Sequence, residues 1–143
     1  MLDAAAVAAA ISEQITAIHV ASYDTPVKRA ITHVLDDLVV SVLDIELSAI
    51  EKRLIAFERG NLVHELHHAV QRTEAASLTA AVERATGRRV IALASHTHLD
   101  PSFVAELFRL GPSTAHLGEQ ESRQPGSRCS TVDGGPDRRV DED

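Results

Sequence analysis

The stretch from residue 61 to residue 110 constrains the fold more than any other part of the chain. It reads as a long helix that ends at Thr86, followed by Gly87, the residue type that most often terminates a helix. Two apolar segments come next, Arg89–Ser95 and Phe103–Leu110, separated by a turn at Leu99-Asp100-Pro101. This order predicts a helix that leads into a β-hairpin.

The first part of the chain has a similar order. Residues 3–22 predict a helix capped by Asp3, and Pro26 breaks it. Two strand-like segments, 27–35 and 38–43, form a second hairpin around Asp36-Asp37, and Ser48-Ala49-Ile50-Glu51 is a capping box that starts another helix. The sequence therefore predicts an α+β fold in the order α-β-β-α-α-β-β, with a four-stranded antiparallel sheet of two hairpins and helices packed on one face.

The spacing of apolar residues predicts which helix faces are buried. The helix over 48–59 is expected to bury Leu47, Ile50, Leu54 and Phe57, and His19 is expected to be half-buried. Gly60 is expected to interrupt the helices, with Asn61 as the cap of the next one. In that long helix the buried stripe is expected to consist of small side chains, namely Leu62, Leu66, Ala69, Val70, Thr73, Ser77, Ala80 and Ala81.

Composition limits the classes of function. The net charge is −7 without a basic stripe, which argues against nucleic-acid binding, because Lys and Arg supply most of that affinity. Absence of a secretory signal and of an apolar run near 20 residues predicts a cytoplasmic protein with no direct membrane insertion. Residues 1–110 are expected to form the domain and residues 111–143, which include Cys129, a disordered acidic tail.

Two histidine-rich segments imitate zinc-enzyme motifs. HELHH would use His64, Glu65 and His68, but catalytic zinc needs a third protein ligand, and the expected wheel position turns both histidines to solvent. HTHLD would use His96, His98 and Asp100, but Pro101 replaces the histidine that would follow. The sequence predicts no catalytic residue, no cofactor and no metal site; the remaining metal candidates are His67, His96 and His98.

Three segments carry a resemblance to a known family: TPVKRAITHVLDDLVVSVL, LSAIEKRLIAFERGNLVHELHHAVQ and TGRRVIALASHTHLDPSFVAELFRL. In this order and spacing, over residues 5–110, the chain resembles the MpsC-like family, named after a component of a sodium-translocating, membrane-potential-generating system. The sequence departs from the family pattern at Tyr23-Asp24-Thr25-Pro26, around His67 and His68, and at His96. The resemblance implies a soluble accessory domain linked to ion or inorganic-carbon transport, with no catalytic residues to carry over.

Together these features predict a non-enzymatic accessory or protein-interaction domain. A homodimer is expected, with the small-residue stripe or the edge of the second hairpin as its interface, and transport subunits in the membrane are expected partners. Two alternatives stay open: a zinc hydrolase that uses the HELHH or HTHLD histidines, and a regulatory module that binds a small ligand between the sheet and the helices.

Overall fold

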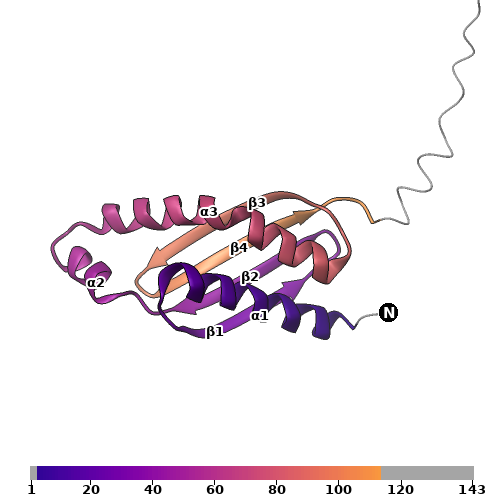
Figure 1. The fold of residues 1–143 in the computed structure, drawn as a ribbon, viewed down its shortest axis with the longest axis horizontal. Coiled ribbons are helices and arrows are strands. Elements are labelled where there is room, and N and C mark those ends of the chain that lie inside the picture. The colour runs from indigo at the N-terminus through magenta and orange to yellow at the C-terminus, as the bar shows by residue number, and fades with distance from the viewer. Residues whose placement is uncertain (1–2, 114–143) are drawn as a thin grey trace, which may run out of the picture.

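The computed structural model describes residues 3–113, which form an α+β fold (Figure 1). The elements are α1 (Ala4–Tyr23), β1 (Val27–Val34), β2 (Leu38–Ile45), α2 (Ala49–Ala56), α3 (Gly60–Thr86), β3 (Val90–Leu99) and β4 (Ser102–Leu110). The strands form one antiparallel sheet in the order β1-β2-β4-β3, so that β2 and β4 join the two hairpins at its centre. The predicted element order and fold class are confirmed.

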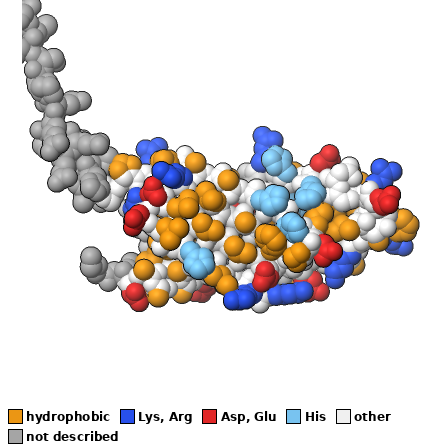
Figure 2. Space-filling view, turned by 180° about the vertical axis from the view of Figure 1, so that it is seen from behind, with side chains coloured by type: hydrophobic (Ala, Val, Ile, Leu, Met, Phe, Trp, Pro, Cys, Tyr) orange, Lys and Arg blue, Asp and Glu red, His pale blue; other side chains and the backbone are white. Residues whose placement is uncertain are grey.

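The helices cover only one face of the sheet. Along β4 the residues Val104, Glu106, Phe108 and Leu110 are buried, whereas the residues between them are at least partly exposed. The strand β2 shows the same alternation, because successive side chains of a strand point to opposite faces. Figure 1 shows α1 and α3 lying side by side across this face, with α1 packed on β1 and α3 on β3. The opposite face, seen in Figure 2, has no helix over it among residues 3–113.

Helix α1 supplies the first part of the core. Asp3 caps it by accepting a hydrogen bond from the Ala5 amide at 3.4 Å, and Ile11, Ile15 and His19 are buried at intervals of four residues. His19 is therefore not half-buried, as expected, but only 4% exposed. Within residues 3–113, α1 is the one helix long and apolar enough to cross a membrane, a condition that core helices of soluble proteins also meet. Its buried side, however, packs against β1 and α3 in this fold.

Helix α2 begins where the sequence predicts but buries other residues than expected. The Ser48 side chain accepts from the Glu51 amide and the Glu51 carboxylate accepts from the Ser48 amide, which confirms the capping box. Leu47 is buried, but Ile50 is 69% exposed and Phe57 is 72% exposed. Since α2 lies at one end of the molecule and packs mainly against α3, no part of the sheet covers these two side chains (Figure 1).

Helix α3 is rotated relative to the expected orientation. It begins at Gly60, without a side-chain cap, and ends at Gly87, which has a left-handed φ of 67°. Leu62 and Leu66 are 42% and 45% exposed, so the prediction of a buried stripe through them is wrong. The buried residues are Val63, His67, Glu74, Leu78, Ala81 and Val82. The prediction failed because two polar residues, His67 and Glu74, lie on the buried side.

The second hairpin is longer than predicted. Strand β3 continues past the predicted end at Ser95 to Leu99 and so includes His96 and His98. The fold also continues just past β4, because the buried Gly111 donates its amide to the Arg89 carbonyl at 2.8 Å. The predicted tail and Cys129 otherwise lie outside the described residues.

Candidate functional site

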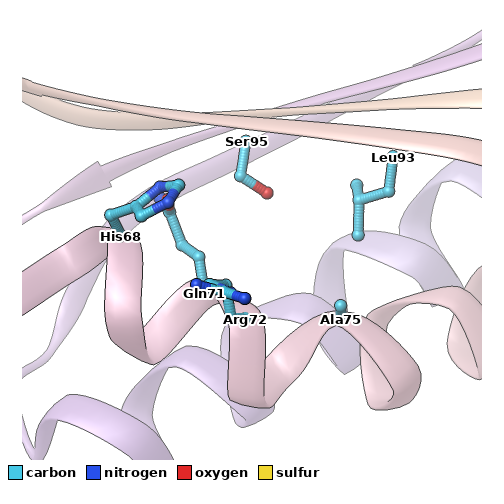
Figure 3. A pocket seen from close by; sticks show the side chains of 6 residues that line it. All are labelled: His68, Gln71, Arg72, Ala75, Leu93 and Ser95. Atoms are coloured by element: carbon cyan, nitrogen blue, oxygen red, sulfur yellow. The ribbon is translucent and has the colours of Figure 1, made fainter.

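A polar cleft lies between α3 and β3. Its first part has a volume of about 180 Å³ and is lined by side chains of α3 on one side and of β3 on the other (Figure 3), namely His68, Gln71, Arg72, Ala75, Leu93 and Ser95. An adjoining part of about 180 Å³ shares three of these residues and is lined by His64, His67, His68, Gln71, Ser95, His96 and Thr97.

The helix places these side chains by its periodicity. Residues 64, 67, 68 and 71 are three or four positions apart, and such residues are neighbours on one side of a helix. That side faces the edge of β3, which is the outermost strand next to α3. His64 and His68 are exposed, as predicted, but they line the cleft instead of pointing away from the sheet.

A chain of hydrogen bonds leads from the cleft into the interior. The Gln71 amide nitrogen donates to Thr97 Oγ1 at 2.9 Å, and Thr97 Oγ1 lies 3.3 Å from His67 Nδ1. His67 Nε2 lies 2.5 Å from Glu51 Oε2. Because an amide nitrogen only donates, the Thr97 hydroxyl has its own proton to give to Nδ1, and the imidazole then donates from Nε2 to the carboxylate. The chain thus favours one tautomer of His67.

Glu51 ends this chain and connects it to the start of α2. Its side chain is almost fully buried and also accepts the Ser48 amide at 3.1 Å. Burial alone raises the pKa of Glu51, but the hydrogen bonds from His67 and Ser48 outweigh that effect and lower the pKa below its ordinary value. The carboxylate is therefore ionised at neutral pH and holds α2 to α3.

Three rings stack beside this chain. Tyr23 lies between His19 and His67, with ring centroids 4.5 Å apart in both pairs. Burial, with a smaller contribution from the nearby His67, lowers the pKa of His19 to about 4. His19 is thus neutral at physiological pH, and burial also raises the pKa of Tyr23. The stack ties the end of α1 to the first third of α3.

Two buried carboxyl groups occupy the floor of the helix–sheet interface. Glu106 on β4 is 3% exposed and accepts a hydrogen bond from the Ser95 hydroxyl. Burial raises its pKa to about 7, partly offset by Ser95 and increased further by the charge of Glu74. Glu74 on α3 is 6% exposed; burial raises its pKa, although Ser22 bonds to it, and its Oε1 atom has no hydrogen-bond partner.

The geometry separates the histidines that the sequence grouped as metal candidates. His67 and His96 both line the adjoining part of the cleft, but His67 is buried with both ring nitrogens engaged, whereas His96 and His98 lie on strand positions that face the uncovered side of the sheet. His98 Nδ1 lies 2.7 Å from the Pro101 carbonyl and its ring stacks on Phe103. Within residues 3–113 no three His, Cys, Asp or Glu side chains form a group that could hold a metal ion.

The carboxylate–imidazole–hydroxyl order of Glu51, His67 and Thr97 is similar to that of hydrolases. Thr97, however, is only 5% exposed, and its oxygen already accepts a hydrogen bond from Gln71. Although Thr97 lines the cleft, the proton of its hydroxyl and one of its lone pairs are thus already engaged within the protein. The arrangement fixes which atoms of Glu51, His67 and Thr97 carry a proton, and it joins α2, α3 and β3.

Sequence reasoning missed most of these polar residues, among them Glu51, Thr97 and Glu106. One signal was available: Glu106 alternates with Val104 and Phe108, so it had to share their buried face. For Glu51 the capping box gave the backbone contact but no indication of the partner sixteen residues away.

The family described as Na+-translocating membrane potential-generating system (MpsC) matches residues 4–111. This range includes every helix and strand of the fold, from α1 to β4. No curated protein and no solved structure matches the chain.

Proposed function

Because this chain belongs to the MpsC family, we propose that it is a non-enzymatic accessory domain that binds membrane subunits of a sodium-translocating, membrane-potential-generating system. On this proposal it acts in the cytoplasm and does not itself enter the bilayer. Its contribution is contact with other proteins rather than turnover of a substrate.

The observation that carries the proposal is the exposed apolar surface of α2 and α3. Four large hydrophobic side chains are 42% to 72% exposed at this end of the molecule: Ile50, Phe57, Leu62 and Leu66. On α3 the exposed side continues through the small residues Ala69, Thr73 and Ser77. Leu62 and Leu66 are one turn apart on α3 and so lie next to each other, and adjacent exposed apolar side chains are typical of protein contact sites. A helix of a membrane subunit, with its own small or apolar side chains, would fit against such a surface.

The experiment compares binding of the full chain and of its variants to the purified membrane subunits in proteoliposomes. Phe57→Asp and Leu66→Asp are expected to weaken binding at least tenfold each, because each inserts a charge into an apolar contact. Ala17→Glu is the matched control, since Ala17 is exposed on α1. The control is expected to bind like the unchanged chain. Equal binding of all variants, or no binding of the unchanged chain, contradicts the proposal.

Metal content separates this proposal from the zinc-hydrolase alternative. Untagged protein is expected to contain less than about a tenth of an equivalent of zinc by mass spectrometry, because a catalytic zinc site needs three protein ligands at one point. One equivalent of zinc that is lost in the His64→Ala and His68→Ala variants would favour the hydrolase instead.

The cleft supports a second candidate function, a regulatory module that binds a small polar molecule. Its walls present imidazole, amide, guanidinium and hydroxyl groups from two different elements (Figure 3). A thermal-shift screen of small metabolites checks it: a stabilising compound whose effect is lost in Arg72→Ala would support this candidate.

A further inference from the structure

The uncovered face of the sheet is built from four rows of side chains. The strand registers place Ile31, Val42, Ala105 and His96 in one row and His33, Val40, Leu107 and Ala94 in the next. The four residues from the two central strands, Val40, Val42, Ala105 and Leu107, form an apolar centre. We call the whole surface the open face. Figure 2 shows hydrophobic side chains gathered across it, with histidines beside them and most charged groups toward the margins.

The ends of the open face carry charges that cancel. In the row at one end Arg29 pairs with Asp44 across the strands, next to Phe103 and His98. At the other end Arg109 Nη2 lies 2.9 Å from Asp37 Oδ2. The open face thus has no net formal charge, although the chain as a whole carries −7. Two copies of the chain, each with a net charge of −7, repel each other at long range. This repulsion is smallest when the two surfaces that approach each other carry no net charge.

The side chains of the open face also permit close approach. Ala92, Ala94 and Ala105 are small, whereas Leu107 beside Ala94 projects and is 41% exposed. Two sheets that pack face to face lie about 10 Å apart, with their side chains interdigitated. Because the open face combines projecting and small side chains, the side chains of two copies of it can interdigitate in this way.

The size of the open face is sufficient for a modest dimer. Four strands about 4.8 Å apart, with eight residues at about 3.3 Å each, give a face of about 19 by 26 Å, or about 500 Å². Two such faces bury about 1,000 Å² in total, below the roughly 1,200–2,000 Å² of stable interfaces, so the expected dimer is a weak one.

We propose that the open face is the interface of a symmetric homodimer, in which the apolar centres of two sheets pack against each other. This interface replaces the two that the sequence suggested, the small-residue stripe and the hairpin edge. It leaves the α2–α3 surface free, so the dimer does not depend on the proposed binding of membrane subunits.

The test is the concentration-dependent mass of the purified full chain by sedimentation equilibrium. A dimer is expected that dissociates on dilution, and Leu107→Glu is expected to raise the dissociation constant at least tenfold, since it places two carboxylates near the centre of the interface. Ala17→Glu makes the same charge change on exposed α1 and is expected to leave the constant unchanged. Circular dichroism and thermal unfolding establish that both variants are folded.

A chain that ends at Ser113 completes the test. It lacks residues 114–143, the other segment that could cover the open face in place of a second copy. The shortened chain is expected to dimerise with the same constant as the full chain. A monomeric full chain at 200 µM (a concentration about a hundredfold above that of a micromolar dimer), or a dimer that tolerates Leu107→Glu, overturns the proposal. Loss of membrane-subunit binding in a protein that still dimerises would count only against the proposed function.

Discussion

At the scale of single residues, Glu106 is the group whose charge the fold opposes most clearly. It lies in the helix–sheet interface, where Glu74 is a second carboxyl group and Tyr23 a further acidic neighbour. Among the residues in contact with it, Ser95 supplies a hydrogen bond but no positive charge. Ionisation of Glu106 therefore weakens the packing of α3 on the sheet.

This environment predicts the pH dependence of stability. The pKa of Glu106 is about 7 in the folded protein and 4.5 ordinarily, so the folded state holds the proton more tightly. The stabilisation that protonated Glu106 gives to the folded state is complete below about pH 4.5. It decreases as the pH rises to about 7 and stays low above that. Glu106→Gln removes the part of the pH dependence that comes from Glu106, while that of Glu74 remains, and is expected to raise the free energy of unfolding at pH 8 by up to about 3 kcal/mol.

Urea unfolding at pH 5 and pH 8 measures this effect. Glu65→Gln is the control, because Glu65 is exposed on α3 and its substitution is expected to leave the pH profile unchanged. A Glu106→Gln protein whose stability falls with pH as steeply as that of the unchanged chain would show that Glu106 is not responsible.

The buried side chains were the hardest part to predict from the sequence. A pattern of apolar spacing treats His67 and Glu74 as solvent-facing and so rotates α3 by the wrong angle. Their burial depends on partners that are distant in the chain: Glu51 is sixteen residues from His67, and Thr97 is thirty residues away. Such partners become visible only once the helices are placed on the sheet, because a polar group is buried where its hydrogen bonds can be met.

At the scale of elements, local signals predicted the helices well. Pro26, the Ser48 capping box and Gly87 mark helix boundaries that the structure confirms. These signals act through neighbouring backbone groups and so can be read from a few residues. The end of β3 was missed because HTHLD was treated as a motif, whereas its alternation continues the strand.

The capping box makes α2 the element most sensitive to one substitution at its start. Ser48→Ala removes the acceptor for the Glu51 amide and is expected to lower the free energy of unfolding by about 0.5–2 kcal/mol. The hydrogen bond from the Ser48 amide to the Glu51 carboxylate comes from the backbone and is kept in this variant. Chemical denaturation at pH 7 measures it. Ser77→Ala, at an exposed position within α3, is expected to change stability by less than about 0.5 kcal/mol. Equal values for the two variants would mean that the cap adds nothing.

At the scale of the whole molecule, the sheet order decides which surfaces remain uncovered. The sequence predicted two hairpins in one four-stranded antiparallel sheet, and this is confirmed. It did not specify that β2 pairs with β4, because an antiparallel pairing between hairpins depends on packing against the helices and not on a turn. The open face follows from that pairing and could not be assigned beforehand.

The described fold and the family match end at nearly the same place, at Leu110 and Gly111. A chain shortened to residues 1–113 is therefore expected to unfold cooperatively with a free energy within about 0.5 kcal/mol of the full chain. Gly111 must be retained, since Arg88 Nη2 donates to its carbonyl at 2.5 Å. A shortened chain that unfolds without cooperativity would place part of the core beyond Ser113.

Strand β3 forms one border of the sheet and pairs only with β4 among the described strands. Its ten residues, VIALASHTHL, include no Lys, Arg, Asp or Glu, whereas the border strand β1 carries Lys28 and Arg29. Charged side chains are the usual protection against unwanted growth of a sheet. In concentrated solution, ordered aggregation would accordingly start from β3, where the backbone of one molecule can be extended by a strand of the next.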